Sequence, residues 1–176
     1  MTSPILYILD SLKDSLLGGT TLSNVYYLAR IDDEGRVLIP IEEKANEFKA
    51  LAPSDTENAY AYIRHLDGGN IFSDEILDGR KLSCYHRKYN VRYELRLVAV
   101  MKNVEPYWLE EKLRSVIVRT QTDNLHEYQN IKFVPKRSII DSIAVLKEES
   151  PKPKQFDKNL IFVAIDFDLS YEMNYY

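Results

Sequence analysis

The feature that most constrains this sequence is a two-residue alternation of apolar and polar side chains. From residue 89 to residue 101 the odd positions are Tyr, Val, Tyr, Leu, Leu, Ala and Met, and the even positions from 90 to 96 are Asn, Arg, Glu and Arg. Alternate residues of a β-strand point to opposite faces, so the pattern predicts a strand with one buried face. A dozen residues is about twice the usual strand length, and at ~3.4 Å per residue it spans roughly 40 Å. We expect a strand within residues 82–102 whose C-terminal part covers the core and whose N-terminal part extends beyond it.

The same period recurs near the C-terminus. One face is predicted to carry Ile161, Val163, Ile165, Phe167, Leu169 and Tyr171, and the other to carry Asp166, Asp168, Ser170 and Glu172. This pattern is typical of a strand with one buried face and one face toward water or a partner.

Two helices are predicted from apolar residues that recur at spacings of three and four. The first covers residues 4–17 and ends at Gly18-Gly19, and the second begins at Glu105-Pro106. Glycine commonly ends a helix, and proline suits its first position. The predicted buried stripes are Ile5, Ile8, Leu9, Leu12 and Leu16 in the first helix, and Leu109, Leu113, Val116 and Ile117 in the second.

The remaining segments are shorter. Strands are predicted at residues 22–31 and 36–39, joined by turn residues 32–35, and further strands at 58–66 and 131–134. We also expect a short helix over residues 42–51 and a turn over residues 67–70, whereas residues 138–149 fit a helix and a strand equally well. The chain is therefore predicted to be a single α+β domain over residues 1–176, with a mostly antiparallel β-sheet and two principal helices packed on one face.

Composition excludes several classes of protein. Among 176 residues, 45% are hydrophobic and 28% are charged, which is ordinary for a globular domain. The net charge of −4 gives no general reason to expect a nucleic-acid or membrane binder. One cysteine excludes a disulfide framework. The longest apolar run, residues 160–165, is far short of the ~18 residues of a membrane span. A secretory signal has a basic residue before its apolar stretch, and the N-terminal apolar stretch here is preceded by none. We expect a protein made in the cytoplasm, without a membrane partner.

Two groups of residues are candidates for metal binding or catalysis. Asp166 and Asp168 form an Asp-x-Asp pair on one strand face, as in some metal sites, but they also fit the polar face of an amphipathic strand. Cys84 and His86 share a strand face, yet no second metal-ligand pair accompanies them and nothing nearby would activate a thiol. Phosphate-binding loops and hydrolase motifs are missing. We therefore expect no enzyme, with no catalytic, metal-binding or cofactor-binding residues and no cofactor.

The stretch from residue 80 to residue 89 interleaves four cations with two tyrosines. Such a pattern fits single-stranded nucleic-acid binding over residues 80–96, where bases stack and phosphates are neutralised. It also fits a solvated strand whose charges suppress edge pairing, or an interface with an acidic neighbour. The chain has 13 tyrosines, a residue type common at interfaces. The candidate subunit-interface residues are Arg80, Lys81, Tyr85, Arg87, Lys88, Tyr89, Tyr175 and Tyr176.

The closing residues 166–173, DFDLSYEM, resemble the C-terminal strand of tail terminator (tail completion) proteins of long-tailed bacteriophages. Those proteins also tend to begin with a short amphipathic helix like the one predicted over residues 4–17. The resemblance implies a small α+β subunit of a homomeric ring, generally a hexamer, that caps the tail tube and joins it to the head. It carries over no catalytic residue. Residues 80–90 and 131–155 have no counterpart in that family. The type of ring protein therefore stays open, with a neck adaptor or a ring protein of a short-tailed phage as the alternatives.

From this resemblance we expect a non-enzymatic virion protein of the neck or tail, made in the host cytoplasm. Its expected partners are identical subunits, as a hexamer or alternatively a dodecamer, and adjoining neck, portal or tail-tube proteins. Phage DNA would pass through the lumen without specific binding, which carboxylates facing inward would favour. The acidic turn is one candidate lumen-facing or partner-facing loop, formed by Asp32, Asp33, Glu34 and Gly35.

Overall fold

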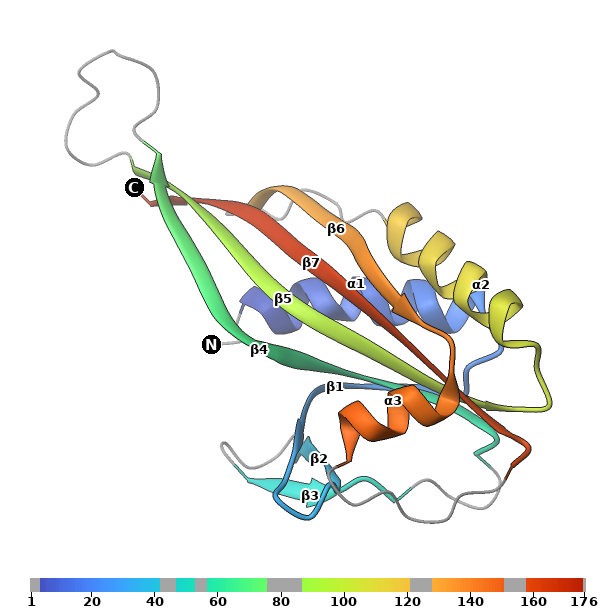
Figure 1. Cartoon of the computed structure of the whole chain (residues 1–176). Coiled ribbons are helices and arrows are strands. Elements are labelled where there is room, and N and C mark those ends of the chain that lie inside the picture. The colour runs from blue at the N-terminus through green and yellow to red at the C-terminus, as the bar shows by residue number, and fades with distance from the viewer. Residues whose placement is uncertain are drawn as a thin grey trace.

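The computed structural model describes residues 4–41, 47–52, 57–75, 87–120, 128–150 and 158–175. Its elements are α1 (Pro4–Gly19), β1 (Asn24–Ile31), β2 (Val37–Pro40), β3 (Phe48–Ala50), β4 (Ala59–Glu75), β5 (Arg87–Lys102), α2 (Pro106–Arg119), β6 (Tyr128–Ile139), α3 (Ser142–Glu149) and β7 (Leu160–Tyr175). The strands form one sheet in the order β3-β2-β1-β4-β5-β7-β6. Every neighbouring pair is antiparallel except β1 and β4. The predicted α+β class is confirmed (Figure 1).

The principal core lies between the sheet and the two predicted helices. Leu12 of α1, Leu113 of α2 and Leu97 of β5 belong to one cluster and are fully buried. The odd positions of β5 from residue 91 point into this cluster, as the alternation predicted, and the half-buried Tyr93 packs against it. α1 and α2 therefore share one face of the sheet, and burying their stripes holds them there.

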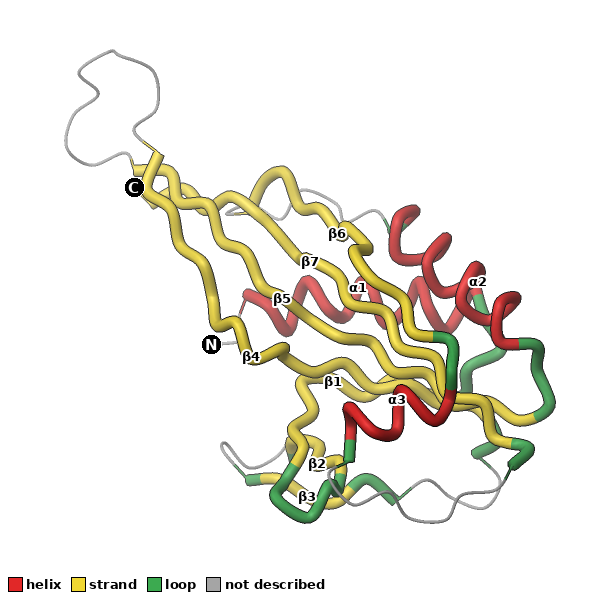
Figure 2. The backbone as a smooth tube through the Cα atoms, viewed as in Figure 1, coloured by secondary structure: helices red, strands yellow, loops and turns green. Residues whose placement is uncertain are grey.

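The opposite face carries α3 and a smaller core. Val145 of α3 is fully buried against a cluster that includes Val98 of β5 and Ile39 of β2. Figure 2 shows that β1 bends sharply before it reaches β2, and its register against β4 is irregular between Tyr27 and Ala29. Such an irregularity bends a strand, and the bend brings β2 over this second face.

The ambiguous segment at residues 138–149 contains both kinds of element. Ser138 and Ile139 end β6, and α3 begins at Ser142. Asp141 lies between the two elements, and its side chain accepts a hydrogen bond from the backbone N–H of Ile143 at 2.9 Å. An aspartate in this N-cap position favours the start of a helix.

Two local predictions are wrong. Residues 48–50, predicted to be helical, form β3 beside β2 because the backbone groups of Lys49 and its neighbours find partners there; residues 42–46 lie outside the described residues. The predicted turn at residues 67–70 lies inside β4. The register shifts there, since His65 pairs with Leu95 and Asn70 with Tyr93. Gly68-Gly69 therefore belongs to a β-bulge, which glycine inside a strand often marks.

The long strands extend well beyond the helices. β5 has 16 residues, which corresponds to roughly 50 Å. It lies between β4 and β7 along nearly its whole length, and β7 ends beside the start of β5. Figure 1 shows β4, β5 and β7 continuing past the first turn of α1 as a ribbon, with the C-terminus near its end. The expectation that the N-terminal part of this strand reaches beyond the core is confirmed.

Candidate functional site

Four of the eight candidate interface residues lie in the projecting ribbon, which we call the β-arm: residues 66–75 of β4, 87–94 of β5 and 168–175 of β7. Arg87, Lys88 and Tyr89 begin β5 at its far end, where Arg87 pairs with Tyr175 in register. The structure thus brings these four predicted residues together. The other predicted interface residues, Arg80, Lys81, Tyr85 and Tyr176, lie outside the described residues, as do Cys84 and His86.

The outer edge of β4 changes character at the β-arm. β1 pairs with β4 only as far as Arg64. Beyond that point, within the described part of the chain, β4 has ladder partners on β5 alone. An unpaired strand edge presents alternate backbone N–H and C=O groups. The β-arm therefore offers a strand edge on which another chain can add.

The opposite sheet edge is formed by β6 and differs from the β4 edge. β6 contains Pro135 and the cations Lys132 and Lys136, and its register against β7 is irregular at two places. Proline, lysine and bulges are the usual means by which proteins prevent edge-to-edge pairing. Strand addition is therefore disfavoured along β6, whereas in the β-arm the bulge is confined to the region of Gly68-Gly69 and residues 70–75 of β4 pair regularly with β5.

An aromatic cluster marks the base of the β-arm. Tyr171 is 3% exposed. Its ring stacks on Tyr93 at a centroid distance of 6.1 Å and meets the edge of Tyr128 at 5.5 Å. His65 lies 5.7 Å from the Tyr93 ring, and burial together with the charge of Arg30 lowers the pKa of this histidine. His65 is therefore neutral at pH 7, and the cluster extends the apolar core toward the arm.

The acidic turn between β1 and β2 is closed by Asp32. Its Oδ1 accepts hydrogen bonds from the backbone N–H groups of Glu34 and Arg36, at 3.0 and 2.8 Å, and its Oδ2 pairs with the Arg36 Nε at 2.7 Å. The Arg36 backbone hydrogen bond is the main cause that lowers the pKa of Asp32. Gly35 has φ 75°, which favours glycine. Asp33 and Glu34 remain exposed, and Figure 1 places the turn away from the β-arm.

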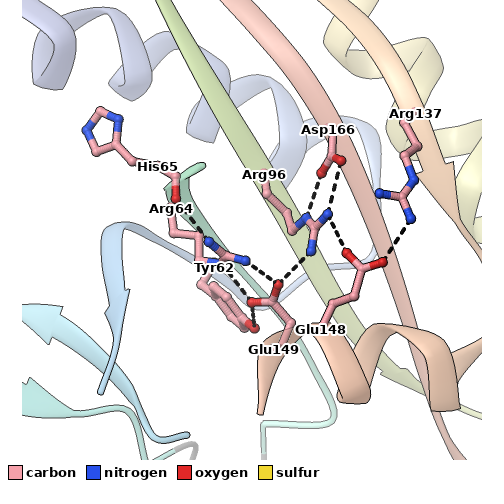
Figure 3. A network of polar contacts seen from close by, with 8 residues as sticks. All are labelled: Tyr62, Arg64, His65, Arg96, Arg137, Glu148, Glu149 and Asp166. Carbon is pink, nitrogen blue, oxygen red and sulfur yellow. Dashed lines mark hydrogen bonds and ion pairs between the residues drawn. The ribbon is translucent and has the colours of Figure 1, made fainter. Parts of the chain in front are cut away.

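A buried ion network lies beneath α3, on the polar face of the central strands (Figure 3). Arg96 is 3% exposed. Its Nε and Nη2 donate to the two carboxylate oxygens of Asp166 at 2.6 and 3.0 Å. Its Nη1 donates to Glu149 at 2.9 Å. A single guanidinium therefore joins β5, β7 and α3.

Glu149 accepts four hydrogen bonds from three residues, of which Arg96 is one. Arg64 of β4 donates from Nε and Nη2 at 2.9 and 2.7 Å, and the hydroxyl of Tyr62 donates at 2.8 Å. Glu148, one residue earlier, pairs with Arg96 at 2.9 Å and with Arg137 at 2.8 Å. Three arginines thus face three carboxylates, which compensates the charge that burial would otherwise penalise. The network fixes the end of α3 to the sheet.

The ion network shifts several pKa values. Burial alone would raise the pKa of Glu149, but Arg64 and Arg96 outweigh it and hold that pKa below its ordinary value. Burial would lower the pKa of Arg96, yet its bonds to Asp166 and Glu149 raise it. Burial beside Glu149 raises the pKa of Tyr62. At neutral pH the carboxylate of Glu149 and both guanidinium groups are therefore charged, and the Tyr62 hydroxyl is neutral.

The Asp-x-Asp pair is held by cations. Asp166 binds Arg96, and Asp168 lies 3.0 Å from the Arg92 Nε and 3.5 Å from the Lys136 Nζ. In the ranges that the structure describes, no group of three or more His, Cys, Asp or Glu side chains is arranged to hold a metal ion. These carboxylates act as the polar face of a strand. The burial of Arg96 also removes it from the proposed nucleic-acid surface at residues 80–96.

The start of α2 carries an exposed aromatic pair that the sequence analysis did not predict. Tyr107 and Trp108 are 67% and 41% exposed. The carboxylate of Glu105 accepts hydrogen bonds from both backbone N–H groups, at 3.0 and 2.7 Å, and so caps the helix. The cap sets the helix so that Leu109 faces the core. The only signal was that positions 107 and 108 fall outside the predicted apolar stripe.

Comparison with known proteins leaves the family open. No protein-family model matches the chain, and no curated protein is similar to it in sequence. Among the described helices, none combines the length and the apolar character needed to cross a membrane.

Proposed function

We propose that this protein is a non-enzymatic subunit of a homomeric ring in the neck or tail of a bacteriophage virion. Within that class we propose a tail terminator or a related head–tail joining protein. The observation that carries the proposal is the β-arm, a ribbon of three strands that extends beyond its own core. An arm of this kind has its use in contact with a neighbour, and a subunit that contacts an identical copy through two different surfaces can close into a ring.

The β-arm has both features that strand-mediated assembly needs. Its β4 edge has backbone groups available for pairing, which supplies affinity. Its helix-side face continues the apolar core, because Val91 and Tyr171 are register partners and both belong to that core. Aromatic residues are common anchors in subunit interfaces. A neighbouring subunit would therefore gain both hydrogen bonds and apolar contact.

The charge distribution supports contact between identical copies. The whole chain has a net charge of −4, whereas residues 80–89 carry four cations and no carboxylate. A basic segment on an acidic chain can meet complementary carboxylates on an identical copy. The exposed carboxylates of Asp33 and Glu34 fit a surface past which DNA moves without binding.

Gel filtration with light scattering on the full chain tests the proposal. We expect an oligomer of defined mass, which Arg87→Glu converts toward monomer while the monomer stays folded. Lys49→Glu is the matched control, because Lys49 is an exposed cation on β3, away from the arm, and its reversal should leave the mass unchanged. A chain that stays monomeric at high concentration and retains single-stranded DNA at low salt would overturn the proposal in favour of nucleic-acid binding.

A further inference from the structure

We propose that a hollow between the end of α1 and the C-terminal half of α2 binds a free phosphate group, as inorganic phosphate or a small phosphate monoester. The hollow has a volume of about 270 Å³. Drug-sized ligands generally occupy pockets of about 300–1,000 Å³, so this one suits a smaller ligand. The described residues that line it are Ser15, Gly19, Lys112, Ser115, Val116, Arg119 and Thr120. The inference is independent of the proposed ring.

Two cations of this hollow are left without an ion pair by the described part of the chain. Lys112 and Arg119 are exposed, and neither has a carboxylate three or four residues away on α2. That is the spacing at which helix side chains meet. Arg114 on the same helix, by contrast, pairs with Glu110 at 3.0 Å. The charges of Lys112 and Arg119 are therefore available to an anion from outside the chain.

The two cations lie on the same side of α2. Seven residues bring a helix back to within about 20° of its starting direction and advance it by roughly 10 Å. Ser115 lies between them and is half-buried, and no described group forms a hydrogen bond with its hydroxyl. A tetrahedral anion between the two long side chains can accept hydrogen bonds from the Arg119 guanidinium, the Lys112 ammonium and the Ser115 hydroxyl.

The remaining polar groups of the hollow are occupied within their own helices. The Oγ of Ser15 donates to the Ser11 carbonyl at 2.9 Å. The Oγ1 and the backbone N–H of Thr120 both donate to the Val116 carbonyl, at 2.8 and 2.9 Å. This carbonyl is therefore not free to bind a cation. No carboxylate is among the described residues that line the hollow, so its chemistry favours an anion.

The helix ends oppose an anion only in part. A helix C-terminus carries about half a negative elementary charge, and both α1 and α2 end beside the hollow. Lys112 and Arg119 bring two full positive charges, so the local sum stays positive. The adjacent Asp14 and Glu111 are exposed and do not line the hollow. Two cations suit one phosphate group better than a polynucleotide, which is followed by a longer basic groove.

Isothermal titration calorimetry of the full chain with inorganic phosphate, at an ionic strength of about 0.15 M, tests the site. We expect one phosphate per chain. Lys112→Gln and Arg119→Gln should each weaken binding about tenfold or more, because each removes a hydrogen bond from a charged donor, and Ser115→Ala should weaken it less. Arg114→Gln is the matched control, because Arg114 is an exposed cation of the same helix that already has a partner. It should bind phosphate as the wild type does.

Thermal unfolding without phosphate shows that the variants remain folded, since both changed side chains are exposed. If the wild type binds no phosphate at millimolar concentration, or if Lys112→Gln and Arg119→Gln bind it as well as the wild type does, the inference is wrong. A single-stranded oligonucleotide that binds through these two residues more tightly than phosphate would also overturn it. The mass of the oligomer should be the same with and without Lys112→Gln, so this test and that of the proposed ring fail separately.

Discussion

Replacing Arg96 by methionine tests whether the ion network beneath α3 holds the fold together. The guanidinium of Arg96 is bonded to Asp166, Glu148 and Glu149. Methionine keeps an unbranched apolar stem of similar length, so the change removes mainly the charge and its hydrogen bonds. Asp166 and Glu149 are 8% and 5% exposed, and their carboxylates would lose their shared donor.

The expected cost follows from which charge is left alone. Removing one partner of a buried ion pair generally costs about 3–5 kcal/mol. Glu149 keeps Arg64 and Tyr62 as donors, so the uncompensated group is Asp166. We therefore expect a loss near the lower end, about 3 kcal/mol. A domain of ordinary stability, about 5–15 kcal/mol, stays folded after such a loss.

Urea unfolding at pH 7 measures the effect. Arg137→Met is the matched control, because the Arg137 side chain is 58% exposed and pairs with Glu148 at the surface, so its loss should cost less than about 1 kcal/mol. Adding Asp166→Asn to Arg96→Met should restore about 1–2 kcal/mol by removing the lone charge. If Arg96→Met costs no more than the Arg137 control, the network does not stabilise the fold as argued.

Three further predictions concern pH, helix packing and the aromatic cluster. The pKa of Glu149 in the folded protein lies below its ordinary value of 4.5. The contribution of its carboxylate to stability is therefore complete above pH 4.5 and is lost as the pH falls through the folded-state pKa. Urea unfolding from pH 7 to pH 3 should show this loss of stability, and Glu149→Gln should make the loss smaller. Gly18→Ala should be neutral or stabilising by up to about 1 kcal/mol, whereas Gly19→Ala should cost about 1–3 kcal/mol. The reason is that a Cβ at position 19 would lie 2.7 Å from the Cγ2 of Val116. Equal or reversed effects of the two variants in thermal unfolding would contradict this packing. Tyr93→Ala should lower the free energy of unfolding by about 3 kcal/mol, since it leaves a cavity beside Tyr171; an unchanged value would mean that the ring is not packed as described.

The regular elements were predictable because their signals are local. The two-residue period of residues 89–101 reports which face of β5 is buried, and the spacing of three and four does the same for α1 and α2. The turn residues 32–35 also placed the β1–β2 connection correctly. In each case a few neighbouring side chains carry the whole signal.

The wrong and undecided segments depend on contacts that are distant in the sequence. β3 forms only because β2 offers backbone partners, and β4 passes through Gly68-Gly69 only because β5 lies beside it as a template. α3 is held through Glu149 by Arg64 and Arg96, which are 85 and 53 residues away. Local propensity contains no record of such partners.

The candidate site was predicted in part. The tyrosine-rich, basic strand indicated an extension beyond the core, and the β-arm is that extension. The exposed pair Tyr107 and Trp108 was missed because the sequence alone does not show which apolar residues of a helix the core leaves uncovered. Arg96 was placed on the polar face correctly, but its burial under α3 required the helix to be in place.

Native mass spectrometry of the full chain most directly tests the claim that this protein acts by assembling with itself through the β-arm. The account predicts one closed stoichiometry, six or twelve copies, that Arg87→Glu dissociates. A single chain as the only species across the concentrations at which the protein is soluble would contradict it.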